Sequence, residues 1–126
     1  MGQSVILYIE DNPENRLLVR RVLESEGYTV VEATDGPAGL EAARQSPPDL
    51  ILLDINLPEI DGYQMVGRLR SVPGLSTVPI IALTANVMRG DRERTLAAGC
   101  DGYIQKPIDV DTLPAQIASY LGRDVA

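Results

Sequence analysis

Five polar residues in this 126-residue sequence each stand at the end of a short apolar run. Three are carboxylates, which repel one another unless a cation lies between them, and hard oxygen ligands suit Mg²⁺. A carboxylate beside a metal, an ammonium and a hydroxyl forms a receptor for a phosphoryl group, with the carboxylate as nucleophile. The five residues are Glu10, Asp11, Asp54, Thr84 and Lys106, and Asp54 is the expected nucleophile.

Each residue also has a simpler explanation when it is taken alone. Asp54 could begin a loop, Thr84 could cap a helix, and Lys106 could be a surface charge. These residues are far apart in the sequence, however, so only the fold can bring them together. The phosphoryl-receptor hypothesis therefore depends on a fold that gathers these strand ends at one edge.

The hydrophobic pattern predicts such a fold, because five short apolar runs alternate with amphipathic stretches. Alternating strands and helices imply a parallel sheet with helices on both faces, here as one doubly wound α/β domain over residues 1–126. Ligands bind at the carboxyl ends of the strands in such sheets. The expected strands are 5–9, 29–33, 50–53, 78–83 and 102–105.

Helix start and stop signals fill the intervals between the runs. Asn12 and Pro13 begin the first helix and Gly27 ends it, whereas Asp35 precedes the second. The other helices are expected from about residue 63 to Pro73, from about 87 to 98, and along an apolar stripe over 113–121.

The composition excludes several classes of function. A net charge of −7 argues against direct binding to nucleic acid or to an anionic membrane, and no apolar run is long enough to span a bilayer. The absence of histidine removes His-dependent catalysis and His-ligated zinc. Lys106 is the only lysine, whereas the sequence has ten arginines, which suggests that an ammonium is needed at this position. The N-terminus lacks a secretory pattern, so we expect a cytoplasmic protein.

The segments YIEDN, LILLDINLPEIDG, PIIALTA and GYIQKP together resemble the receiver domain of bacterial two-component response regulators. The resemblance covers essentially the whole chain. It implies a flavodoxin-like fold with five helices and strand order 2-1-3-4-5. The EDNPEN segment is similar to stand-alone receivers of the DivK type and to receivers attached to hybrid histidine kinases.

The resemblance assigns the metal and phosphoryl sites residue by residue. Asp54 would accept a phosphoryl group, and Glu10 and Asp11 would hold Mg²⁺, or Mn²⁺ as an alternative, together with Asp54 and the backbone carbonyl of Asn56. Glu10 stands where the family often has aspartate, and its longer side chain favours binding through a water. Thr84 and Lys106 would contact the phosphoryl oxygens.

The family also implies a switch and a set of partners. Tyr103 matches the aromatic that turns inward when Thr84 moves toward the phosphate, and a cis peptide bond would join Lys106 to Pro107. The phosphodonor would be a histidine kinase or a histidine phosphotransfer protein, and a target protein would bind the face of the fourth helix, fifth strand and fifth helix. We expect a monomer or weak dimer, with no turnover of an external substrate.

Several alternatives share part of this pattern. A flavodoxin-like cofactor binder would need a Gly- or Ser-rich phosphate loop where this chain has EDNPEN. A dehalogenase-type hydrolase would need a second aspartate two residues after Asp54, but position 56 is Asn56. An EF-hand fails because proline occupies a ligand position. A receiver-like interaction module that works without phosphorylation stays open. The role of Arg16, Arg20 and Arg21 also stays open: they could form a docking edge for a partner protein or simply a solvated basic face.

Overall fold

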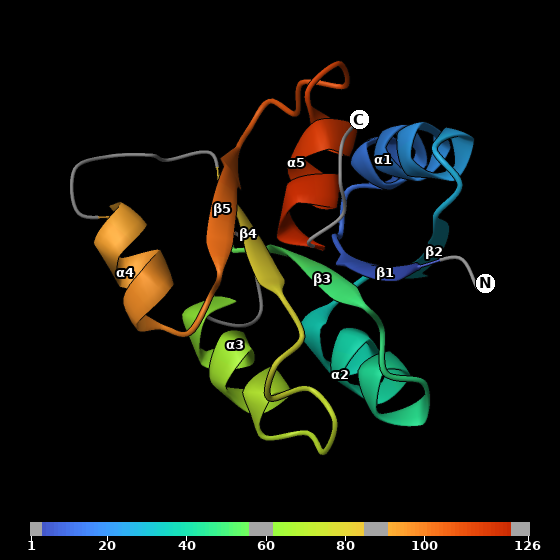
Figure 1. Cartoon of the computed structure of the whole chain (residues 1–126). Coiled ribbons are helices and arrows are strands. Elements are labelled where there is room, and N and C mark those ends of the chain that lie inside the picture. The colour runs from blue at the N-terminus through green and yellow to red at the C-terminus, as the bar shows by residue number, and fades with distance from the viewer. Residues whose placement is uncertain (1–3, 56–61, 85–90, 122–126) are drawn as a thin grey trace.

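A parallel sheet with helices on both faces organises the chain, as a computed structural model shows (Figure 1). The structure describes residues 4–55, 62–84 and 91–121. The strand order is β2-β1-β3-β4-β5, which confirms the predicted fold class. The strands are β1 (Val5–Ile9), β2 (Thr29–Ala33), β3 (Leu50–Asp54), β4 (Ile80–Thr84) and β5 (Gly102–Gln105), and the helices are α1 (Pro13–Ser25), α2 (Gly36–Gln45), α3 (Gly62–Arg70), α4 (Asp91–Ala97) and α5 (Leu113–Tyr120).

Helix α1 begins and ends where its capping residues predict. The Asn12 side chain accepts hydrogen bonds from the backbone N–H groups of Glu14 and Asn15, at 2.8 and 3.0 Å. At the other end Gly27 adopts a φ of 92°, a left-handed conformation that favours glycine, and the Tyr28 N–H reaches back to the preceding turn. These caps fix the direction in which the chain leaves β1 and returns to β2.

The strand boundaries differ from expectation at two places that matter for the site. Strand β3 continues through Asp54, and β4 runs from Ile80 to Thr84 instead of over 78–83. Pro79 has no N–H for the ladder, so pairing by backbone donors starts at the next residue. Asp54 and Thr84 are therefore held by the sheet itself, and Asp54 lies opposite Leu83.

The remaining helices follow the predicted pattern in the described part of the chain. Asp35 caps α2 through a hydrogen bond from the Ala38 N–H, and the stripe of α5 buries Leu113 and Ile117. Helix α4 is described from Asp91 to Ala97; the earlier part of the predicted 87–98 helix lies outside the described residues. No helix among the described residues is long and apolar enough to cross a membrane.

Helices cover both faces of the sheet (Figure 1), and a layer of apolar side chains lies between the sheet and the helices on each face. One layer packs α1 and α5 against one face through Val19, Leu23, Leu113 and Ile117. The other packs α2 and α3 against the opposite face, with Ala43, Met65, Val66 and Leu69 at its centre. Because β1, β3 and β4 are covered on both faces, their side chains are apolar in both directions until the strands end.

The packing predicts opposite effects for two glycines inside helices. A Cβ at Gly39 in α2 would overlap the buried side chain of Ile9, whereas a Cβ at Gly67 in α3 would meet nothing within 4 Å. Gly39→Ala should lower the free energy of unfolding by about 1–3 kcal/mol through overpacking. Gly67→Ala should raise it by roughly 0.5–1 kcal/mol, because alanine favours the helix. Urea unfolding of both variants checks this, and equal effects would contradict the packing of α2 on β1.

Candidate functional site

The sheet brings the five predicted residues to the carboxyl ends of four adjacent strands. Glu10 and Asp11 follow β1, Asp54 ends β3, Thr84 ends β4, and Lys106 follows β5. The Lys106 N–H donates to the Thr84 carbonyl at 2.8 Å, which extends the β4–β5 ladder up to the lysine. Each side chain therefore starts from backbone that the sheet already fixes.

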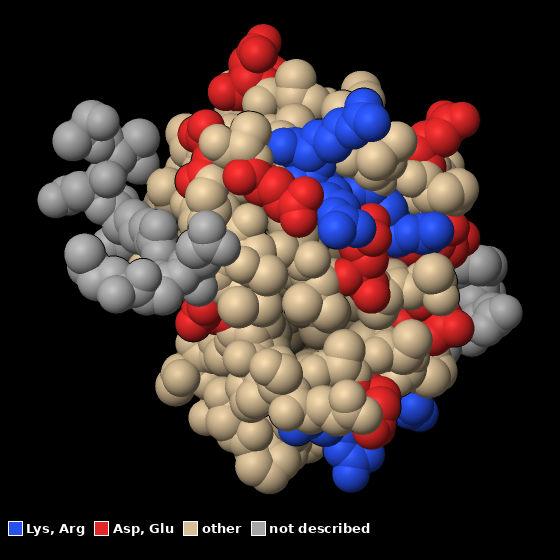
Figure 2. Space-filling model, turned by 90° about the vertical axis from the view of Figure 1, so that its right-hand side faces the viewer, with Lys and Arg blue, Asp and Glu red and all other residues tan. Residues whose placement is uncertain are grey.

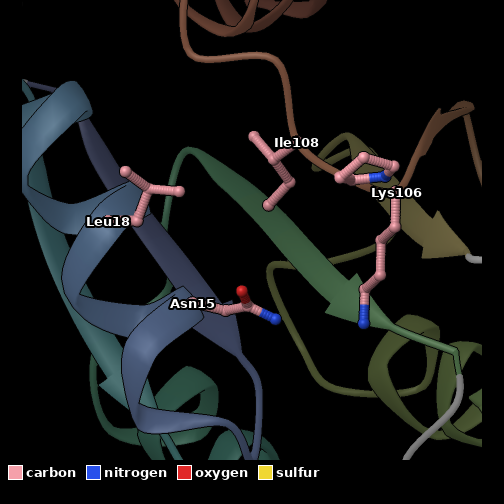
Figure 3. A pocket seen from close by; sticks show the side chains of 5 residues that line it. Asn15, Leu18, Lys106 and Ile108 are labelled. Atoms are coloured by element: carbon pink, nitrogen blue, oxygen red, sulfur yellow. The ribbon is translucent and has the colours of Figure 1, made fainter.

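The ammonium of Lys106 lies between two of the carboxylates. Its Nζ is 3.1 Å from Asp54 Oδ1 and 3.5 Å from Glu10 Oε1. Figure 3 shows the lysine side chain pointing toward the end of β3. Lys106 is the cation among the described residues that offsets both buried carboxylates.

The three acids form a cluster that suits a divalent cation. One carboxylate oxygen from each of Glu10, Asp11 and Asp54 lies within 4.8 Å of the others. Asp54 is 2% exposed and Glu10 is 1% exposed, whereas Asp11 is exposed and has no hydrogen bond or ion pair within the described part of the chain. Three carboxylates with one ammonium leave excess negative charge, and hard oxygen donors suit Mg²⁺. The donor set therefore fits the expected ion.

The residues that hold Glu10 are not among those expected from the sequence. The Tyr8 hydroxyl donates to Glu10 Oε1 at 3.0 Å, Asn15 Nδ2 approaches the same oxygen at 3.4 Å, and the Asn12 N–H donates to Oε2 at 3.3 Å. Arg16 donates to the Glu10 carbonyl at 2.8 Å. One signal in the sequence points to this contact: Tyr8 lies in β1 two residues before Glu10, whose N–H still bonds to the Ala33 carbonyl of β2, so both side chains project from the same face.

The surroundings of Glu10 shift its protonation. The pKa of Glu10 is raised from 4.5 to about 7, mainly by burial and next by a hydrogen bond to Asp54 and by the Asp54 charge. The Lys106 ammonium and the Asn12 N–H act in the opposite direction. Burial and the Glu10 charge also raise the pKa of Tyr8, so the hydroxyl keeps its proton and donates.

This shift predicts how the stability of the metal-free protein depends on pH. Folded Glu10 holds its proton up to about pH 7, whereas the unfolded side chain releases it near 4.5. The folded state thus binds more protons between these values, so stability falls as the pH rises through this window, by roughly 2–3 kcal/mol. The free energy of unfolding of the wild-type protein, measured in EDTA from pH 5 to 8, tests this dependence. The variant Glu10→Gln serves as the comparison, and it should not lose stability over this range. Parallel profiles for the two proteins would contradict it.

The other predicted residues are placed as follows. Thr84 is buried at 6% exposure, and Tyr103, opposite Ala82 in the ladder, is half-buried against the α2–α3 layer. The peptide bond between Lys106 and Pro107 is cis, the isomer that the resemblance implied. Asn56, the expected carbonyl ligand, lies outside the described residues.

The basic residues of α1 are largely engaged within the chain. Arg20 contacts Glu24 at 3.3 Å and Glu32 at 3.2 Å, and Arg16 is bonded to the Glu10 carbonyl. Figure 2 views the molecule from the side that lies at the right of Figure 1, where α1 is at the top. Basic and acidic side chains are intermixed over the upper part of this view. Of the cluster, Arg21 alone has no hydrogen bond or ion pair among the described residues. The α1 surface is therefore locally balanced in charge.

Comparison with known proteins identifies the class. The family model of the response regulator receiver domain matches residues 6–118. The chain is 43% identical over 122 residues to the polar-differentiation response regulator DivK of Brucella anthropi, and the match covers 97% of this chain and 98% of that protein. DivK of Brucella ovis matches to the same extent. The chain belongs to the response regulator receiver family of two-component signalling systems.

Solved structures agree with this assignment. The receiver domain of a sensor histidine kinase from Pseudomonas aeruginosa PAO1, described with a magnesium ion coordinated in its active-site cleft, is 38% identical with a TM-score of 0.87, over 96% of this chain and 99% of that one. The chemotaxis protein CheY4 of Vibrio cholerae is 27% identical with a TM-score of 0.90, over 94% and 99% of the two chains. The observed strand order is thus shared with receivers.

Proposed function

We propose that the protein is a phosphoacceptor in a His–Asp phosphorelay, with Asp54 as the residue that takes the phosphoryl group. The observation that carries this proposal is the Lys106 ammonium, 3.1 Å from Asp54 and beside a cluster of three acid oxygens at one strand edge. In the reaction an Asp54 oxygen bonds to phosphorus, the bond from phosphorus to the donor nitrogen breaks, and the donor histidine takes up a proton.

The side chains divide this task between them. Asp11, Asp54 and Glu10, with the Asn56 carbonyl, would hold Mg²⁺, or Mn²⁺ in its place. The ion supplies Lewis-acid neutralisation of the phosphoryl oxygens when it is bound. Lys106 adds a fixed positive charge at the same place, and burial of Asp54 in β3 restricts its motion so that its oxygen is presented in one direction. A carboxylate that ends a rigid strand is well suited to in-line attack.

We propose that the phosphodonor approaches between α1 and the segment after β5. A cavity of about 380 Å³ lies there, lined by Asn15, Leu18, Lys106, Pro107 and Ile108 (Figure 3). Leu18 is 41% exposed and lines this cavity together with Ile108, so apolar side chains adjoin the lysine. A helix of a histidine kinase or histidine phosphotransfer protein, with apolar residues beside its phosphohistidine, suits this surface.

The output would be a change in protein contacts. In the proposed switch Thr84 moves toward the phosphoryl group and Tyr103 turns inward, which alters the face made by α4, β5 and α5. Leu96 on α4 is 43% exposed and could contact a target protein there. The protein would act in the cytoplasm as a monomer or weak dimer, without turnover of an external substrate and without direct contact to nucleic acid.

Acetyl phosphate tests the proposal without a partner protein. Incubation with Mg²⁺ should add one phosphoryl group to the intact mass, and EDTA should prevent it. If the adduct decays too fast to be weighed, beryllofluoride, which mimics the phosphoryl group, should still bind in the presence of Mg²⁺. Absence of both the adduct and beryllofluoride binding would contradict the proposal and favour an interaction module that works without phosphorylation.

A further inference from the structure

Tyr8 brings a single hydroxyl into an otherwise aliphatic strand. Strand β1 reads VILYI, and Tyr8 is fully buried in the layer that α1 and α5 cover. A buried tyrosine hydroxyl needs a partner, and here it donates to Glu10 Oε1 at 3.0 Å. The core of the sheet is thereby connected directly to an acid of the metal cluster.

The two oxygens of Glu10 have unequal surroundings. Three donors surround Oε1: the Tyr8 hydroxyl at 3.0 Å, Asn15 Nδ2 at 3.4 Å and Lys106 Nζ at 3.5 Å. The Asn12 N–H at 3.3 Å is the one described N–H donor to Oε2, and Glu10 also shares a hydrogen bond with the Asp54 carboxyl in the metal-free state. A carboxylate oxygen accepts about two hydrogen bonds, so Oε1 is saturated whereas Oε2 can accept a further partner.

We propose that Tyr8 is a positioning residue that holds Glu10 by Oε1 and leaves Oε2 alone available to the cation. This inference rests on the proposed function, because it concerns the same metal site. The consequence of this positioning is selectivity of the site for Mg²⁺ over Ca²⁺. Ca²⁺ takes more ligands than Mg²⁺ and often binds both oxygens of one carboxylate, whereas Mg²⁺ is held through few carboxylate oxygens and several waters. A Glu10 that offers one oxygen therefore favours Mg²⁺.

The variant Tyr8→Phe tests the role because it removes the hydroxyl and keeps the ring in the core. We expect Mg²⁺ affinity to fall by about tenfold, since loss of a group that orients a metal ligand typically weakens binding by 10–100-fold. The ratio of Ca²⁺ to Mg²⁺ affinity should rise, because Glu10 becomes free to offer both oxygens. Titrations with each ion, followed by the backbone amide signals in NMR spectra, measure both quantities.

Two further variants separate positioning from packing. Tyr28→Phe removes a hydroxyl from a tyrosine that is 6% exposed in the same apolar layer, and it should change neither affinity. Glu10→Asp shortens the acid, so the hydroxyl loses its contact, and adding Tyr8→Phe to this variant should have no further effect on the ratio. Glu10→Asp alone keeps the tyrosine in the core and breaks the same contact, so it gives a second reading if Tyr8→Phe is unstable.

The outcomes also separate this inference from the proposed function. Unchanged Mg²⁺ affinity and an unchanged ion ratio in Tyr8→Phe would overturn the role of Tyr8 while leaving phosphoryl uptake at Asp54 intact. If the wild-type protein binds no Mg²⁺, the proposed metal site fails, and the role of Tyr8 fails with it. An equal loss of affinity in Tyr28→Phe would assign the effect to core packing and would also overturn the inference.

Discussion

The variant Lys106→Met should take up a phosphoryl group from acetyl phosphate about 10²–10³-fold more slowly than the wild-type protein. The reason is that Lys106 Nζ lies 3.1 Å from Asp54 Oδ1, where under the proposed function it would neutralise the charge that gathers on the phosphoryl oxygens during transfer. The initial rate of adduct formation at saturating Mg²⁺, followed by intact mass, measures the effect.

A matched control separates local charge from total charge. Arg21 on α1 is exposed and has no hydrogen bond or ion pair among the described residues, so Arg21→Met changes the net charge equally and should leave the rate unchanged. Lys106→Arg keeps the charge but replaces a compact ammonium with a planar group, so an intermediate rate is expected. Equal rates for Lys106→Met and Arg21→Met would contradict a direct role of the lysine.

The second large effect concerns the acceptor itself. Asp54→Asn should abolish phosphoryl uptake, because a neutral amide has no carboxylate oxygen to attack phosphorus. It should also lower the pKa of Glu10 toward its ordinary value, since Asp54 contributes to the upward shift. Intact mass with Mg²⁺ and acetyl phosphate measures the first effect, and unfolding in EDTA as a function of pH measures the second.

The control for this variant is a second acid near the same edge of the sheet. Asp35 follows β2 and caps α2 through the Ala38 N–H, and asparagine caps a helix about as well. Asp35→Asn should therefore keep both the fold and phosphoryl uptake. Continued uptake by Asp54→Asn would move the acceptor to another residue and contradict the account.

The sequence was sufficient to predict the fold and the gathering of the site residues, for identifiable reasons. Buried parallel strands are continuous apolar runs, and each run here ends at a polar residue or cap signal that can be read directly. The order β2-β1-β3-β4-β5 came from the resemblance to receivers, because periodicity alone does not order strands. The strand expected over 78–83 begins two residues before β4 does, because Pro79 has no N–H for the ladder, which an apolar run does not reveal.

Contacts between side chains and distant backbone were beyond prediction. Arg70 at the end of α3 donates to the Gly99 carbonyl at 2.8 Å and contacts Asp101 at 2.6 Å, and thus connects α3 to the start of β5. Nothing in the spacing of these residues indicates the contact, because it depends on how the connecting segments pack. The hydrogen bond from the Tyr8 hydroxyl to Glu10 is also absent from the expectations, although the spacing of two residues places both side chains on one face of the sheet.

The most direct test of the central claim locates the phosphoryl group by chemistry. An aspartyl phosphate is an acyl phosphate, so borohydride reduces its carbonyl carbon to an alcohol and releases phosphate, leaving homoserine at that position. After reaction with acetyl phosphate and Mg²⁺, peptide mass spectrometry should find homoserine in place of Asp54, and the EDTA-treated sample should keep aspartate. Homoserine at another position, or a phosphoryl adduct that yields none at position 54, would contradict the assignment of Asp54 as the acceptor.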